Sequence, residues 1–214
     1  MMNLKTTARS RLAHGKKGFT LTEIAIVLGI IGLILGAIWV AASSVYANQK
    51  VSKAITAQLQ IAQGIRALYG NSANTGSAAF TDITTNMCSA GVFPTDMVVA
   101  CGTTAATVAI SDPWINGVAG GTTVKILAED ISAAGADDGF AIAFPSVPTS
   151  ACISLLSGLG QGGIFGGVAA PAASPVVATA ALLALPATPV AASAAAVCGA
   201  AATNTVYVVY KLKG

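Results

Sequence analysis

The most informative segment of the chain is Lys16-Lys17-Gly18-Phe19-Thr20-Leu21-Thr22-Glu23-Ile24-Ala25-Ile26-Val27-Leu28-Gly29. It opens an apolar block, Ile24 to Ala42, that contains no charged and no strongly polar residue. Nineteen residues that rise about 1.5 Å each span about 30 Å as a helix, which is the thickness of a membrane's hydrocarbon layer. The block therefore predicts a membrane helix, with Glu23 as the single acid at its start.

The basic residues gather before the apolar block. Residues 1–18 carry five Lys or Arg and no acid, giving +5, and the rest of the chain carries six Lys or Arg against eight Asp or Glu, giving −2. Basic residues beside an apolar helix are typical of a segment retained in the cytoplasm, which places the following residues across the membrane. A nucleic-acid-binding cluster is the alternative, and the absence of interleaved aromatic residues argues against it.

The composition argues against an enzyme. Charged residues make up 9% of the 214 residues and hydrophobic residues 54%, which fits one domain with an appended apolar segment. The only histidine, His14, precedes the apolar block. The acidic pairs Glu129-Asp130 and Asp137-Asp138 are expected to be solvated residues of loops. The sequence therefore predicts no catalytic site, no cofactor and no small-molecule substrate.

Four cysteines follow the apolar block, in the part expected to enter an oxidising compartment. Four cysteines allow three pairings. Our hypothesis is the sequential pairing, Cys88 with Cys101 and Cys152 with Cys198, because it closes two separate loops. A zinc site is disfavoured because there is no CxxC motif and no nearby histidine, so no metal is expected.

The junction resembles the class III leader of type IV prepilins over about the first 45 residues: basic residues, a glycine, Phe-Thr-Leu-x-Glu and a long apolar run. The resemblance implies that a prepilin peptidase cuts between Gly18 and Phe19 and that the new amine of Phe19 is N-methylated. It also implies that Glu23 pairs with the N-terminal amine of a neighbouring subunit and so selects the register of assembly. The alternative for Glu23 is an incidental charge that reaches the membrane interface.

The apolar spacing continues past the membrane block at steps of three and four residues, which predicts one helix to about Tyr69. The turn-forming residues 70–74 end it. Beyond it, short β-prone runs alternate with turns, so the fold is expected to be α+β, a long helix packed against an antiparallel sheet. The last strand could lie in the middle of that sheet. The expected strands are 98–100, 107–110, 124–127, 140–144 and 206–212.

Residues 140–156 predict a strand, a turn and a helix that contains Cys152. This order is similar to the type IVb pilins, in which a C-terminal disulfide, here Cys152–Cys198, closes the exposed region. Residues 158–202 are rich in Gly, Ala, Pro and Val, and the prolines Pro186 and Pro189 argue against a second membrane helix. A GxGxxG match at 158–163 is interpreted as a flexible loop, because no strand precedes it directly. The Ala-rich part is expected to cover the sheet or face a neighbouring subunit.

The resemblance predicts four parts: a leader (1–18), a transmembrane and polymerisation helix (19–46), its amphipathic continuation (47–70) and a periplasmic or extracellular head (71–214). It implies a pilus subunit whose partners are other copies, the peptidase, the inner membrane and its assembly machinery. Adhesion, aggregation, motility and DNA transfer stay open as roles. The alternatives are a type II secretion pseudopilin and an anchored or secreted binding protein, cut after Ala47 if secreted.

Overall fold

The computed structural model describes residues 18–132, 136–158, 165–168, 182–184, 191–199 and 202–213. The chain forms two compact units, residues 1–44 and residues 45–214. Most of the expected leader lies outside the described residues, as do long parts of the Ala-rich region between 159 and 201.

The first element is a helix of 48 residues, α1 (Leu21–Leu68). From Ala54 onward one of its faces is buried, and the spacing of three and four residues there follows the turn of an α-helix. Gly70 and the turn after it end the helix, so the predicted end near Tyr69 is confirmed. The buried residues are Ala54, Gln58, Ile61, Ala62 and Ile65.

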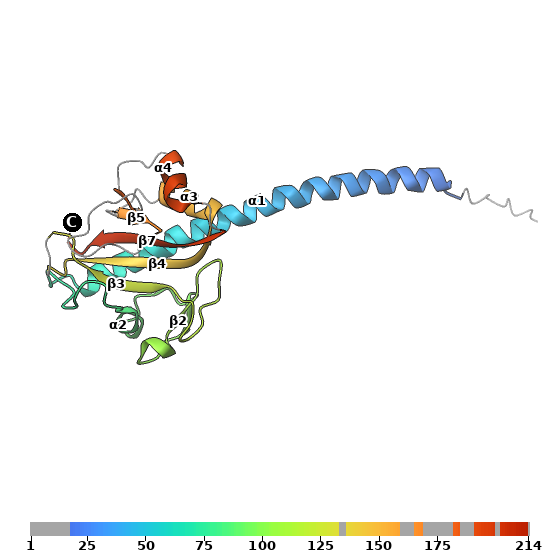
Figure 1. The fold of residues 1–214 in the computed structure, drawn as a ribbon. Helices are drawn as coiled ribbons and strands as arrows, with labels where there is room; N and C mark the ends of the chain where they lie inside the picture. The colour runs from blue at the N-terminus through green and yellow to red at the C-terminus, as the bar shows by residue number, and fades with distance from the viewer. Residues whose placement is uncertain are drawn as a thin grey trace, which may run out of the picture. The chain divides into compact units, whose positions relative to one another are not determined.

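The described part of the head contains a five-stranded antiparallel sheet in the order β3-β4-β7-β5-β6. Its strands are β3 (Lys125–Glu129), β4 (Gly139–Pro148), β5 (Phe165–Gly167), β6 (Leu182–Ala184) and β7 (Thr203–Lys211). The last strand, β7, pairs with β4 on one side and β5 on the other, as expected from the sequence. Figure 1 shows β7 in this central place.

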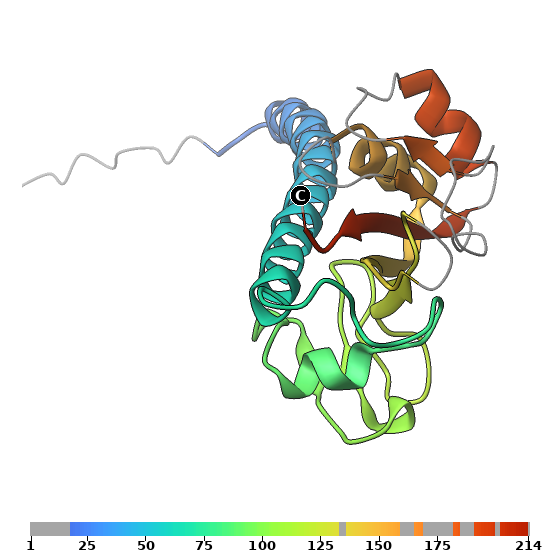
Figure 2. The same ribbon diagram turned by 90° about the vertical axis from the view of Figure 1, so that its left-hand side faces the viewer.

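The main core lies between the sheet and the part of α1 that belongs to the head (Figures 1 and 2). Tyr210 of β7 is 1% exposed, and its hydroxyl accepts a hydrogen bond of 2.8 Å from Nε2 of Gln58 on α1. Its ring stacks on Phe140 of β4 with 5.4 Å between the centroids. Because side chains alternate along a strand, Ile142 and Val208 lie on the same face of the sheet and complete this layer.

Smaller elements surround the sheet. The segment between α1 and β3 holds α2 (Thr84–Ser89), β1 (Val98–Ala100), a 3₁₀ turn η1 (Ala105–Thr107) and β2 (Ala109–Ile110). Strands β1 and β2 form a two-stranded antiparallel ribbon. The helices α3 (Thr149–Gly158) and α4 (Ala191–Cys198) lie side by side, near β5 (Figure 2).

Two local predictions need correction. The expected strand 107–110 is shorter, because Thr107 closes η1: its hydroxyl accepts from the backbone N–H of Thr104 at 3.1 Å and donates to the Thr104 carbonyl at 2.9 Å. Hydroxyl side chains compete with strand pairing in this way. No turn separates β4 from α3, because β4 runs to Pro148 and α3 starts at Thr149. A bulge between Phe144 and Val147, with Ser146 at a φ of 55°, replaces it.

The region 158–202 contributes elements that the sequence did not predict. Strands β5 and β6 extend the sheet beyond β7, and α4 carries Cys198. The expected flexible loop at 158–163 lies almost wholly outside the described residues.

Candidate functional site

The predicted processing and assembly residues lie at the start of α1. Thr20 precedes the helix, and its hydroxyl accepts a hydrogen bond of 3.3 Å from the backbone N–H of Glu23. This is the Ser/Thr-x-x-Glu spacing of a helix N-terminus, where an acid in the first turn also interacts favourably with the helix dipole. Glu23 therefore helps to start the helix as well as lying at its surface.

Phe19 and Glu23 face one hollow. Together with three aliphatic side chains of the first turns they line a depression of about 250 Å³. The Phe19 side chain is 77% exposed. The structure thus places Phe19, for which the resemblance implied processing, beside Glu23, for which it implied a role in assembly, with Gly18 directly before Phe19. The aliphatic residues are Ile24, Val27 and Leu28.

Every residue from Gly18 to Gln49 is exposed. The most apolar 18-residue window of α1 has a mean hydropathy of 2.8, so the helix is long and apolar enough to cross a membrane. Exposed aliphatic side chains continue along it as far as Val45, and Trp39 is 80% exposed. An apolar surface of this extent on a soluble monomer is rare and indicates contact with lipid or with other protein chains.

Two disulfides cross-link the head, in the pairing that the sequence analysis proposed. Cys88 of α2 is bonded to Cys101, which follows β1. Cys152 of α3 is bonded to Cys198 at the end of α4, and both are buried. Loops of 13 and 46 residues are closed, for which the chain-entropy estimate is about 3 and about 4 kcal/mol.

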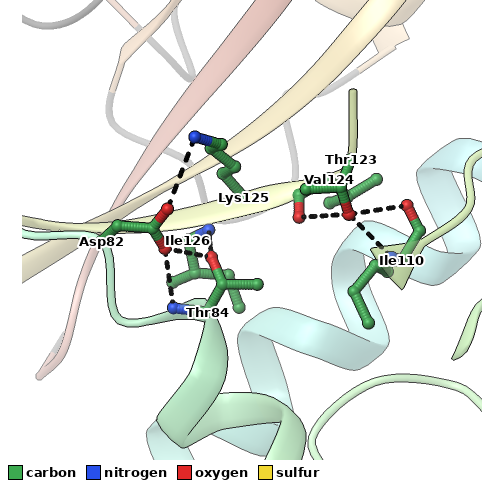
Figure 3. A network of polar contacts seen from close by, with 7 residues as sticks. All are labelled: Asp82, Thr84, Ile110, Thr123, Val124, Lys125 and Ile126. Carbon is green, nitrogen blue, oxygen red and sulfur yellow. Dashed lines mark hydrogen bonds and ion pairs between the residues drawn. The ribbon is translucent and has the colours of Figure 1, made fainter. Parts of the chain in front are cut away.

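A network of polar contacts, which the sequence analysis missed, holds the segment before α2 against β3 (Figure 3). Oδ1 of Asp82 accepts from the backbone N–H of Thr84 at 3.0 Å and from the Thr84 hydroxyl. Oγ1 of Thr84 in turn accepts from the backbone N–H of Ile126 at 2.9 Å. Oδ2 of Asp82 lies 3.5 Å from Nζ of Lys125, a partly exposed ion pair that contributes little by itself. The sequence signal is Asp-x-Thr, with the Thr as the first residue of a short helix.

This network belongs to a seam that covers the free edge of β3. The backbone N–H of Phe80 donates to the carbonyl of Ala128 at 2.7 Å, and the N–H of Ala128 donates to the carbonyl of Thr81 at 2.9 Å. The N–H of Ile83 donates to the carbonyl of Ile126 at 2.9 Å. An uncovered edge strand is a template for pairing with other chains, so the seam leaves β3 unavailable for that pairing.

The prediction that the acidic pair Glu129-Asp130 is solvated was wrong, because both residues are buried. Glu129 is the last residue of β3, it is fully buried, and neither of its carboxylate oxygens has a hydrogen-bond partner. Burial raises the pKa of Glu129 to about 8, and the charge of Asp130 acts in the same direction. Asp130 is itself buried, and its carboxylate accepts from the backbone N–H of Asp137 at 2.7 Å.

The reason is the position of Glu129 in the sheet. It is paired with Gly139, and the side chain of Ile131 occupies the space that a side chain at Gly139 would take, so Ile131 covers this end of the sheet. Asp138 does lie in the turn between the strands, where its carboxylate accepts from the backbone N–H groups of Ile131 and Ser132 at 2.8 and 3.2 Å.

Among the described residues no group of three or more His, Cys, Asp or Glu side chains could hold a metal ion.

Comparison with known proteins identifies the family. A family model described as PilS N terminal matches residues 47–211, and a model of the prokaryotic N-terminal methylation motif matches residues 14–39. Among solved structures, TcpA, a type IV pilin from Vibrio cholerae El Tor biotype, is 17% identical with a TM-score of 0.50, over 76% of this chain and 98% of that one. A type IV b pilin from Salmonella typhi is 18% identical with a TM-score of 0.47, over 78% of this chain and 99% of that one. Curated protein sequences gave no significant match.

The family match spans nearly the whole of the head, and the methylation motif covers the junction at Gly18 and Phe19. The fold agrees with it, because a long N-terminal helix packs its second half against an antiparallel sheet. The chain therefore belongs to the type IV pilins, in the family described as PilS N terminal, as the resemblance to the type IVb class predicted.

Proposed function

We propose that this pilin is made as a precursor, is cut between Gly18 and Phe19 by a prepilin peptidase, and polymerises through residues 19–46 into a surface filament. The observation that carries the proposal is the continuous exposed apolar surface of α1 with a single acid, Glu23, at its start. Lipid would cover this surface before assembly, and the helices of other copies would cover it afterwards.

Glu23 would select the register between copies. A carboxylate in an apolar environment costs about 3 kcal/mol or more unless a partner compensates it. Phe19 lines the same hollow, and cleavage would make its nitrogen a cationic, N-methylated terminus. The Phe19 amine of one copy could then pair with the Glu23 carboxylate of the next, so that docking is favourable only in the register that joins the two charges.

The parts of the chain would then have separate tasks. Residues 1–18 would keep the N-terminus in the cytoplasm until the peptidase removes them, and residues 19–46 would span the inner membrane and later form the filament core. Residues 47–70 would continue the helix into the head, residues 71–214, which would lie in the periplasm and then on the pilus surface. The partners would be other copies, the peptidase and the assembly machinery of the inner membrane.

The deciding experiment is N-terminal sequencing with intact mass on filaments sheared from cells. The proposal expects a methylated Phe19 start and a mass four hydrogens below the reduced chain, from the two disulfides. The variant Gly18→Val should retain the Met1 start, because a branched side chain would stand at the scissile bond. The matched control Gly15→Val, three residues upstream, should be cut normally.

A mature start at Asn48 would instead identify a secreted binding protein, and an uncut Met1 start in the parent chain would indicate an anchored one. Either result would contradict the proposed filament.

A further inference from the structure

A groove follows the second half of α1, beside the face that packs on the sheet. It consists of two adjoining pockets of about 370 and about 160 Å³. Lys53 and Ala57 of α1 line both pockets on the helix side, and Asp96 lines both on the opposite side. The smaller pocket is also lined by Asp112.

Asp112 presents an unpartnered charge to this groove. Its side chain is only 7% exposed. Oδ1 accepts from the backbone N–H groups of Trp114 and Ile115 at 2.7 and 2.9 Å, whereas the buried Oδ2 has no hydrogen-bond partner. Leaving a buried acceptor of this kind unsatisfied is unfavourable. Burial accordingly raises the pKa of Asp112, although the two N–H groups and the charge of Lys50 act against that rise.

The lysines on α1 do not satisfy the acids. In the described part of the chain, neither Lys50 nor Lys53 has an ammonium within 4.0 Å of a carboxylate, and Nζ of Lys50 lies 5.0 Å from the ring centroid of Tyr46. Asp96 is exposed and likewise has no ion-pair partner. The wall opposite α1 therefore carries two carboxylates that could accept a cation from outside the chain.

Among the other basic residues in the described part of the head, one exposed lysine without an ion-pair partner could supply this cation. Lys125 is paired with Asp82, and Nε of Arg66 donates to the carbonyl of Lys211 at 3.1 Å. Lys211 is partly buried in β7. Lys213, two residues beyond β7, is exposed, and it forms no ion pair within 4.0 Å among the described residues.

We propose that Asp96 and Asp112 form a docking site for a second copy of this chain, which places its Lys213 in the groove. The inference rests on the proposed filament, since polymerisation through residues 19–46 would bring copies side by side along the same helix that forms the groove. Charge complementarity supports it: an ammonium group would supply the missing partner of Oδ2 of Asp112 and a second contact at Asp96. The contact joins two copies, so it forms only in the assembled state. It does not require Lys213 to reach the groove of its own chain.

Cysteine cross-linking in assembled filaments tests this contact. The double variant Asp96→Cys/Lys213→Cys, oxidised mildly in sheared filaments, should give a ladder of disulfide-linked multimers on non-reducing electrophoresis. Each single variant should give no ladder, since a ladder needs two reactive positions in every copy. The matched control is Asp96→Cys/Lys125→Cys, which replaces an exposed lysine that already has an intramolecular partner, and it should stay monomeric.

Charge exchange provides an independent measurement. Asp96→Lys or Lys213→Asp alone should lower the yield of sheared filament by about tenfold, the effect of about 1.4 kcal/mol on a contact. The combined variant Asp96→Lys/Lys213→Asp should recover only part of the yield, because opposite charges meet again at position 96 while Asp112 still lacks a cationic partner.

Normal filaments without a cross-link, or a ladder of equal strength from the Lys125→Cys control, would overturn the contact and leave the filament proposal standing. Failure of the parent chain to form filaments would overturn both proposals together.

Discussion

Replacing Glu129 by glutamine should make the head more stable at neutral pH. The carboxyl group is fully buried without a partner, and its pKa is raised from 4.5 in the unfolded chain to about 8. Between these values the folded protein holds a proton that the unfolded chain has lost. Stability therefore falls as pH rises from about 4.5 to about 8, and is unaffected by this group below that window.

The size of the effect follows from 1.36 kcal/mol per pKa unit. At pH 7 the unfolded carboxyl group is about two and a half units above its pKa and the folded one is still mostly protonated, so the loss is about 3 kcal/mol. Glu129→Gln keeps the shape and removes the ionisation. The variant should therefore unfold with a free energy about 3 kcal/mol above that of the parent at pH 7, and within about 1 kcal/mol of it at pH 4.5.

The assay is denaturant unfolding of the full chain in detergent at several pH values, followed by the fluorescence of Trp114, which packs against the core. A Trp39→Phe background removes the second tryptophan, which lies in the exposed part of α1. The matched control is Asp96→Asn, an exposed acid whose replacement should change stability by less than about 0.5 kcal/mol at every pH. A constant difference between Glu129→Gln and the parent from pH 4.5 to 8 would refute the reasoning, because ionisation of Glu129 would then have no part in it.

Three further predictions concern the seam, the C-terminal disulfide and assembly. Thr84→Val removes the acceptor of the Ile126 N–H, so the unfolding free energy should fall by about 1–3 kcal/mol and hydrogen exchange of that amide should become faster. Thr84→Ser keeps the hydroxyl and should behave like the parent. Equal exchange rates in both variants would contradict the role of the hydroxyl. Replacing Cys152 and Cys198 together by alanine should lower the unfolding free energy by about 4 kcal/mol in the same denaturation assay, and an unchanged midpoint would show that the 46-residue loop adds nothing. Glu23→Val should still enter the membrane and yet fail to appear in sheared filaments, and normal assembly of this variant would remove the register argument.

The parts of the fold that could be predicted are those that depend on local pattern. The spacing of apolar residues gave the end of α1 near Tyr69, because one buried face imposes the helical period on the sequence. The β-branched and aromatic residues near the C-terminus predicted β7, and its richness in such residues suits a strand with neighbours on both sides. The strand at 98–100 was also predicted with the bounds that the structure has.

What could not be predicted depends on residues far away in the sequence. Glu129 next to Asp130 has the composition of a turn, and its burial follows only from the layer packed around the end of β3. The buried oxygen of Asp112 depends in the same way on the segment facing α1. At Thr107 the competing effect was local: one hydroxyl group closes a 3₁₀ turn where propensity favoured a strand.

The central place of β7 has a consequence for the order of folding. Its partner β4 ends at Pro148, and β7 begins only at Thr203, so the middle of the sheet forms by closing a loop of more than fifty residues. Until β7 pairs, β4 and β5 each lack one neighbouring strand. The face of the sheet that packs on α1 then also lacks its central strand, which carries the Tyr210 that contacts Gln58. In the proposed export, residues 1–18 would stay in the cytoplasm and the head would cross the membrane behind α1, so β7 would cross after every other element described here. The head should therefore remain unfolded throughout translocation and close its sheet in a single late step, once residue 211 has crossed.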